Sequence, residues 1–224
     1  MKTGFREYIY NEVVQKYSAF DAAHKEDHAL TVIDQALELM RRRGAWLESQ
    51  QNPADIWRSE IREDILLAAA ACHDLGLVNG RDRHHLDSGE IIRGDQELRR
   101  WFTEDEIETI AQAAEDHRAS GTGAPRSIYG MLVAESDRVI DADTIIRRTI
   151  QFGFKHYPDL GREGHMQRAV DHLIEKYGRG GYLKLWIPWS DNAARLSALQ
   201  DTIADPVAVR EAVAKAYYLV AKKL

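Results

Sequence analysis

Apolar residues recur along most of the chain at intervals of three and four positions, the spacing of one buried helix face. The segments with this spacing are 5–20, 28–43, 61–72, 103–117, 126–140, 144–154, 163–177 and 206–219. No segment alternates apolar and polar residues between hairpin turns, and 182–187 is the one stretch that suggests a short strand or extended piece. The pattern predicts an all-α bundle of roughly eight to ten helices.

One helix in this pattern is apolar on every side. Residues 65–72 are all Ile, Leu, Ala or Cys, and they lead directly into the pair His73 and Asp74. Asp55, after a polar loop, is the predicted N-cap of this helix, and Gly76 is predicted to let the chain turn away at its end. Polar side chains against a hydrophobic wall need partners. The pair is therefore either a structural hydrogen bond or half of a metal site.

Two further histidines are predicted near helix starts. His28 falls in the first turn of its helix. His85 lies four residues before Gly89 on one helix face, where the glycine leaves room for a backbone, a metal ion or a substrate. His84, which precedes it, is an alternative. The other histidines fall mostly on polar faces or in loops: His24, His84, His156, His165 and His172.

Two more polar residues fall on helix faces that are otherwise apolar. Thr103 and Glu106 match a capping box, and His117 lies on the apolar face of the helix that they begin. Asp137 lies on the apolar face of the next helix. The inward-facing set then comes from five elements: His28, His73, Asp74, His85, His117 and Asp137. Side chains from facing helices form metal sites in bundles, although a single inward histidine is equally explained by a hydrogen bond to a backbone carbonyl.

As an ordered set, these residues resemble the signature of the HD-domain metal-dependent phosphohydrolases. The matching stretches are His-Ala-Leu-Thr-Val at His28, His-Asp-Leu-Gly at His73, His-His-Leu-Asp-Ser-Gly around His85, Glu-Asp-His-Arg at His117 and Ser-Asp-Arg-Val-Ile-Asp at Asp137. The resemblance covers about residues 20–145, the size of a domain. It implies an HD-type helical core at 21–145. The helical spacing of the apolar residues at 5–20 predicts a lead-in helix at 1–20 that covers this core. We expect 146–224 to form a helical extension packed on that core.

The resemblance also implies a ligand set. His28, His73, Asp74 and Asp137 would hold one divalent ion, and Asp74 would bridge to a second ion held by His85 and His117. Asp74 and His73 would be the catalytic residues. Imidazole and carboxylate ligands suit iron, manganese, cobalt, nickel or zinc, with magnesium also considered, at one or two ions per chain.

Basic residues near these motifs are candidates for binding a substrate phosphate, since the planar guanidinium suits that task. They are Arg81, Arg83, Arg118 and Arg138. Many relatives carry a lysine shortly after the His-Asp-Leu-Gly motif, but Leu77 stands here. A phosphate-binding lysine at that point is therefore absent from this sequence.

The leading functional hypothesis is hydrolysis of a phosphoester or phosphoanhydride in a small, nucleotide-like substrate. One alternative is a di-iron oxygenase, because a few relatives use the same ligands to activate oxygen. The other is a non-catalytic HD module that binds a nucleotide or a partner, but such a module has no need to keep costly buried carboxylates. We expect the last third of the chain to supply substrate-selecting contacts or contacts between copies in a homo-oligomer.

Composition limits the binding partners and the cellular location that we expect for this protein. The 224 residues carry a net charge of −6, which argues against a nucleic-acid polymer as partner because that binding needs a basic field. The single cysteine, Cys72, has no internal disulfide partner. The first residues lack the apolar stretch of a signal peptide, and no run is long and apolar enough to span a bilayer. We therefore expect a cytoplasmic protein that is not bound to a membrane.

Overall fold

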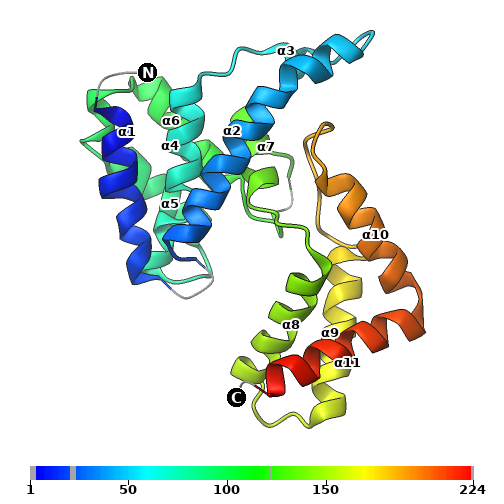
Figure 1. The fold of residues 1–224 in the computed structure, drawn as a ribbon. Helices are drawn as coiled ribbons and strands as arrows, with labels where there is room; N and C mark the ends of the chain where they lie inside the picture. The colour runs from blue at the N-terminus through cyan, green and yellow to red at the C-terminus, as the bar shows by residue number, and fades with distance from the viewer. Residues whose placement is uncertain (1–3, 21–23, 122, 223–224) are drawn as a thin grey trace. The chain divides into compact units, whose positions relative to one another are not determined.

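The computed structural model describes residues 4–20, 24–121 and 123–222, and within them every regular element is helical (Figure 1). This confirms the predicted all-α class, and residues 182–187 contain no strand. The α-helices are α1 (Phe5–Tyr8), α2 (Glu26–Ser49), α3 (Asp55–Arg58), α4 (Glu63–Cys72), α5 (His84–Gly94), α6 (Glu104–Glu115), α7 (Ile128–Ser136), α8 (Ala142–His156), α9 (Arg162–Tyr177), α10 (Asn192–Ala204) and α11 (Pro206–Ala221). A π-helix (Ile9–Val13) and a 3-10 helix (Val14–Ala19) continue α1, and further 3-10 turns occupy Leu75–Asn79 and Leu98–Arg100.

The chain divides into two compact units. The first contains residues 1–138 together with Trp186–Ser190, and the second contains Val139–Leu185 and Asp191–Leu224. The continuous part of the first unit ends at Arg138, seven residues before residue 145, the limit of the core expected from the sequence. The chain also returns to the first unit for five residues, which the sequence pattern did not indicate.

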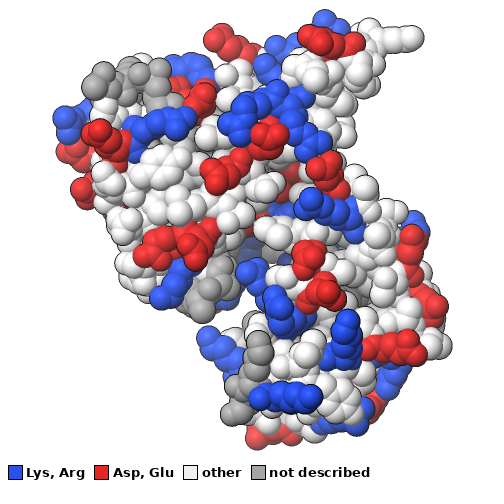
Figure 2. Space-filling model, viewed as in Figure 1, with Lys and Arg blue, Asp and Glu red and all other residues white. Residues whose placement is uncertain are grey.

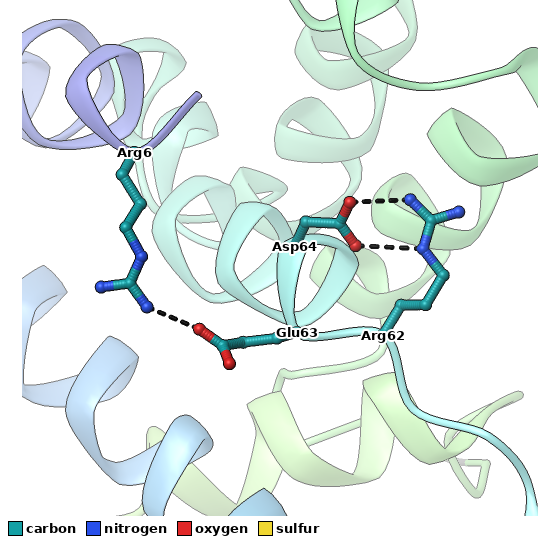
Figure 3. A pocket seen from close by; sticks show the side chains of 4 residues that line it. All are labelled: Arg6, Arg62, Glu63 and Asp64. Carbon is teal, nitrogen blue, oxygen red and sulfur yellow. Dashed lines mark hydrogen bonds and ion pairs between the residues drawn. The ribbon is translucent and has the colours of Figure 1, made fainter. Parts of the chain in front are cut away.

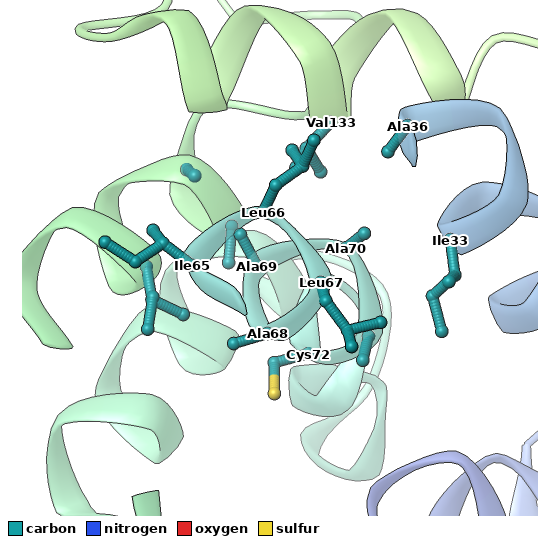
Figure 4. Close-up of a cluster of buried hydrophobic side chains, with 14 of the residues drawn as sticks. Ile33, Ala36, Ile65, Leu66, Leu67, Ala68, Ala69, Ala70, Cys72 and Val133 are labelled. Carbon is teal, nitrogen blue, oxygen red and sulfur yellow. The ribbon is translucent and has the colours of Figure 1, made fainter. Parts of the chain in front are cut away.

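Helix α4 is the centre of the first unit. All residues from Ile65 to Cys72 are buried, as expected for a helix that is apolar on every side. Figure 4 shows Ile33 and Ala36 of α2, and Val133 of α7, facing α4 from neighbouring helices. Each fully buried leucine in such a core contributes about 1.5–3 kcal/mol of transfer free energy. The core therefore holds the end of α4, and with it His73 and Asp74, in one place.

The start of α4 differs from the expectation. Asp55 begins the short helix α3 instead of capping a helix that continues to Cys72. The backbone of Arg62 is extended, and its N–H donates to the hydroxyl of Tyr129 at 2.9 Å rather than to a helical carbonyl. The side chain of Arg62 is held by Asp64 and Glu106. These tertiary contacts interrupt the helix between α3 and α4.

Residues 5–17 pack on the core of the first unit. Phe5 packs edge-on against Phe102, with ring centroids 5.2 Å apart. Tyr17 is fully buried, and its hydroxyl donates to the carbonyl of Ala71 at 2.9 Å and accepts the backbone N–H of Asp74 at 3.2 Å. The segment thereby fixes the backbone on which His73 and Asp74 stand.

The second unit consists of α8 to α11. Three of these helices confirm the predicted segments, and α10 is an addition to them. Gly153 of α8 allows close packing, since a Cβ there would lie 3.0 Å from Nδ1 of His165 and 3.1 Å from Nε of Arg168. His165 is buried, although the sequence pattern placed the histidines outside the candidate set mostly on polar faces or in loops.

Surface charge is mixed. On the face drawn in Figure 2, basic and acidic side chains are interspersed over each unit. Within the described residues, no helix combines the length and the apolar character needed to cross a membrane.

Candidate metal centre

Two groups of histidine and aspartate side chains meet at the C-terminal end of α4, where His73 and Asp74 follow the helix. The first joins His28 of α2, His73 at the end of α4 and Asp137 at the end of α7. Nε2 of His28 lies 3.3 Å from Nε2 of His73 and 3.3 Å from Oδ1 of Asp137. Nε2 of His73 lies 3.9 Å from the same oxygen. Three elements far apart in sequence thus present three ligand atoms to one point.

The second group joins Asp74 with His84 of α5 and His117 after α6. Nε2 of His84 and Nε2 of His117 are 3.2 Å apart, and each lies 3.4 Å from Oδ1 of Asp74. The other oxygen of Asp74, Oδ2, lies 3.5 Å from Nε2 of His28 and 3.3 Å from Nε2 of His73. The two oxygens of one buried carboxylate therefore face the two groups, which is a bridging arrangement.

The remaining ring nitrogens hold three of these histidines in orientation. Nδ1 of His73 lies 2.8 Å from the carbonyl of Ala70, and Nδ1 of His117 lies 2.5 Å from that of Ala114. Nδ1 of His84 lies 2.7 Å from the carbonyl of Arg81. Because a carbonyl can only accept, Nδ1 carries a proton in each ring, and in the neutral imidazole Nε2 then offers its lone pair to the centre. This is the outer hydrogen bonding that metal-binding histidines usually have.

The electrostatics of the cluster favour a cation. Burial opposes ionisation of Asp74 and Asp137, but the surrounding histidines outweigh it and lower the pKa of both carboxyls below their ordinary range. Burial likewise opposes the charged form of His28, but its contacts with Asp137 and Asp74 outweigh burial and raise its pKa to about 9. The carboxylates thus stabilise positive charge at this point, and imidazole nitrogens with carboxylate oxygens are ligands that suit a divalent ion.

The structure places His84, and not His85, beside Asp74 and His117. Successive helical residues point about 100° apart, so only one of the two can face the cluster. Nδ1 of His85 is buried without a hydrogen-bond partner among the described residues. Burial and the positive charge of Arg118 lower the pKa of His85 to about 4. The expected ligand is therefore replaced by its neighbour, and the hydrogen bond of His84 to a carbonyl could not be seen in the sequence.

Two glycines near the cluster serve close packing rather than a backbone turn. Gly76 lies in a 3-10 turn with negative φ, and a Cβ there would stand 2.0 Å from the carbonyl oxygen of His84. Gly89, expected to leave room beside His85, instead makes room for Glu115, whose Oε1 would lie 2.4 Å from a Cβ. The glycines therefore set how closely α5 approaches the end of α4 and α6.

The candidate phosphate-binding arginines are placed differently from one another. Nη2 of Arg81 lies 3.3 Å from Nε2 of His24, and the rings of His24 and His28 are 5.5 Å apart. This puts Arg81 beside the first group, together with a histidine that the sequence pattern had set aside. In contrast, Arg83 is exposed and pairs with Glu90 at 3.6 Å.

The other two arginines are more constrained. Arg118 follows His117, and its Nη1 donates to the carbonyl of Asp82 at 2.5 Å. Arg138 follows Asp137 and is only 7% exposed. Its Nε and Nη1 are buried without a hydrogen-bond partner among the described residues. A buried guanidinium without partners is costly, and a bound anion would offset that cost.

A surface pocket of about 460 Å³ lies elsewhere on the first unit, lined by Arg6, Arg62, Glu63 and Asp64 (Figure 3). The four side chains pair with one another, Arg6 with Glu63 at 2.5 Å and Arg62 with Asp64 at 2.7 Å. The Arg6–Glu63 pair is exposed and contributes little free energy, whereas the Arg62–Asp64 pair is bidentate and partly buried. None of the candidate metal ligands lines this pocket.

The fold and the site define a class: an all-α protein with a buried histidine–aspartate centre suited to divalent metal ions. Comparison with protein families identifies the family itself. The sequence model of the HD domain family matches residues 26–141, which is more than half of the chain. The chain therefore belongs to this family. HD domains bind divalent metal ions and are mostly metal-dependent hydrolases. Searches of curated proteins and of solved structures found no match.

Proposed function

We propose that this protein is a metal-dependent phosphohydrolase that cleaves a phosphoester or phosphoanhydride bond of a small, nucleotide-like substrate. The observation that carries the proposal is the carboxylate of Asp74, which is buried and directs one oxygen to each group of histidines. Burying a carboxylate is costly unless it is paired or coordinates a metal ion. The arrangement suits two adjacent divalent ions bridged by one carboxylate.

The residues present would hold two ions. His28, His73 and Asp137 would bind one, His84 and His117 would bind the other, and Asp74 would bridge them. Bound ions of this kind lower the pKa of water and neutralise negative charge on a phosphoryl group. Iron, manganese, cobalt, nickel and zinc suit mixed imidazole and carboxylate ligands better than calcium does, and magnesium stays a candidate.

The protein's own contribution is orientation and charge. Carbonyl hydrogen bonds to Nδ1 keep the rings of His73, His84 and His117 directed at the centre, so that little reorganisation is needed on binding. Arg138, which follows Asp137 and has two guanidinium nitrogens without a hydrogen-bond partner among the described residues, and Arg81, which contacts His24, are the candidate donors for a phosphoryl oxygen. Arg83 is the weakest candidate because it pairs with Glu90 at the surface.

The test begins with metal analysis of protein purified without chelators. Phosphate and nucleotide release is then measured over a panel of small phosphorylated compounds with each divalent ion. We expect one or two ions per chain and ion-dependent phosphate release, both lost in Asp74→Asn and kept in His156→Ala, which alters an exposed histidine of the second unit. Full activity in Asp74→Asn would refute the proposal. Turnover that requires dissolved oxygen would favour the di-iron oxygenase instead, and binding without turnover would favour a non-catalytic module.

A further inference from the structure

The five residues Trp186–Ser190, which we name the return segment, are held in the first unit by a buried carboxylate. Glu135, on the last turn of α7, is only 1% exposed. Its Oε2 accepts the backbone N–H of Trp186 at 2.8 Å and that of Ile187 at 3.4 Å. An ionised acceptor makes such hydrogen bonds stronger than neutral ones, and a buried carboxylate is costly without them.

The other end of the return segment is fixed to α2. Trp189 is 6% exposed, and its indole N–H donates to the carbonyl of Leu39 at 2.8 Å. Its ring also packs against Trp46 of α2, with centroids 4.8 Å apart, and against Trp57 of α3 at 5.4 Å. A buried aromatic cluster of this kind fixes the relative position of the elements that contribute to it.

These two attachments cross-link α7 and α2, the helices that present Asp137 and His28 to each other. Glu135 precedes Asp137 by two residues, and Asp137 meets His28 at 3.3 Å. The second group is built differently, with Asp74, His84 and His117 at the end of α4, on α5 and after α6. The return segment therefore contacts the two helices that carry His28 and Asp137, at Leu39 and Trp46 of α2 and at Glu135 of α7.

We propose that Glu135 is a positioning residue: by binding the return segment, it sets the distance between Asp137 and His28 and thereby the metal affinity of the first group. This inference rests on the proposed metal binding. Removing a hydrogen bond made directly to a metal ligand commonly changes affinity by roughly tenfold to a hundredfold, and because Glu135 acts through the return segment we expect the lower end of that range. Selective weakening of one of two ion positions is the expected signature.

The experiment compares Glu135→Ala with wild type by metal titration against a chromophoric chelator, using Mn²⁺ and Co²⁺. We expect Glu135→Ala to lose roughly tenfold in affinity at one position and to keep the other. His28→Ala should weaken the same position, and His84→Ala should weaken the opposite one. Glu135→Gln keeps an acceptor oxygen and should restore two-ion binding. Ser127→Ala is the matched control, because it removes the hydrogen bond to Gly130 at the other end of α7 and leaves the return segment untouched.

Tryptophan fluorescence gives a readout independent of metal. Release of the return segment should expose Trp189 to iodide quenching in Glu135→Ala but not in Glu135→Gln or Ser127→Ala. Equal loss at both positions, or unchanged affinity, would overturn the positioning role while leaving the metal centre intact. Wild-type protein that binds no ion under any condition would instead overturn the proposed function, and the positioning role with it.

Discussion

Gly76→Ala tests whether the close approach of α5 to the end of α4 builds the candidate metal centre. An added Cβ would lie 2.0 Å from the carbonyl oxygen of His84 and 2.5 Å from the backbone nitrogen of Ser88. A carbon–oxygen contact requires about 3.3 Å, so the first turn of α5 would have to move by roughly 1.3 Å. The obstacle is backbone on both counts, so no side-chain rotation relieves it.

The displacement would act on stability and on metal binding together. Overpacking a well-packed site costs about 1–3 kcal/mol. We expect the upper part of that range because the substitution would also disturb the hydrogen bond from Gly76 N–H to Ser88 Oγ, which is 2.8 Å long. His84 would leave its position 3.4 Å from Asp74, although metal ligands must be placed to within about 0.2 Å. The variant should therefore lose the ion held by His84 and His117.

Urea unfolding and metal stoichiometry measure these effects on the same preparation. Gly44→Ala is the matched control, because nothing lies within 4 Å of a Cβ there, in the exposed part of α2. Replacing glycine by alanine in a helix at such a position should stabilise the protein by up to about 1 kcal/mol and leave metal binding unchanged. A Gly76→Ala protein with wild-type stability and two bound ions would refute the packing argument.

Three further predictions follow from the same structure. Treatment with a chelator should lower the unfolding free energy, because an ion that binds only the folded state contributes about 2.7 kcal/mol at a hundredfold excess over Kd; an unchanged melting temperature would contradict metal binding. Burial, with the nearby charge of Asp95, raises the pKa of Cys72 to about 12, so at pH 8 only about one thiol in ten thousand is ionised. Ellman's reagent should therefore react with Cys72 only on unfolding, and fast labelling of the native protein would contradict its burial. Leu66→Ala, at a fully buried position of α4, should destabilise the protein by about 2–5 kcal/mol in urea unfolding, whereas a loss below about 1 kcal/mol would show that α4 is not the centre of the core.

Much of the candidate site could be predicted without the fold. The apolar run before His73 and Asp74 can be buried only as a central helix, and this places the pair at the edge of the core. His28, His117 and Asp137 fall where the helical period turns them inward, and the structure brings all three to the cluster. Local periodicity suffices here because each residue's direction follows from its own helix.

Other features depended on how the helices meet. His84 and His85 differ by one residue, and only the rotation of α5 against α4 selects His84. The need for Gly76 arises from the approach of α5, since φ at this position is negative and other residues could adopt it. The hydrogen bond between Glu135 and the backbone of Trp186 joins residues 51 positions apart, and no local sequence pattern indicates such a contact.

The sequence alone determined the helical class, the central helix and the order of most candidate ligands, because burial of apolar faces is a local and periodic signal. Tertiary structure alone decided which histidine completes the second group and where the chain returns to the first unit. The reason is physical. A rotation of about 100° or a shift of about 1 Å between packed helices leaves the apolar periodicity of the sequence unchanged, but it changes which side-chain atoms are in contact.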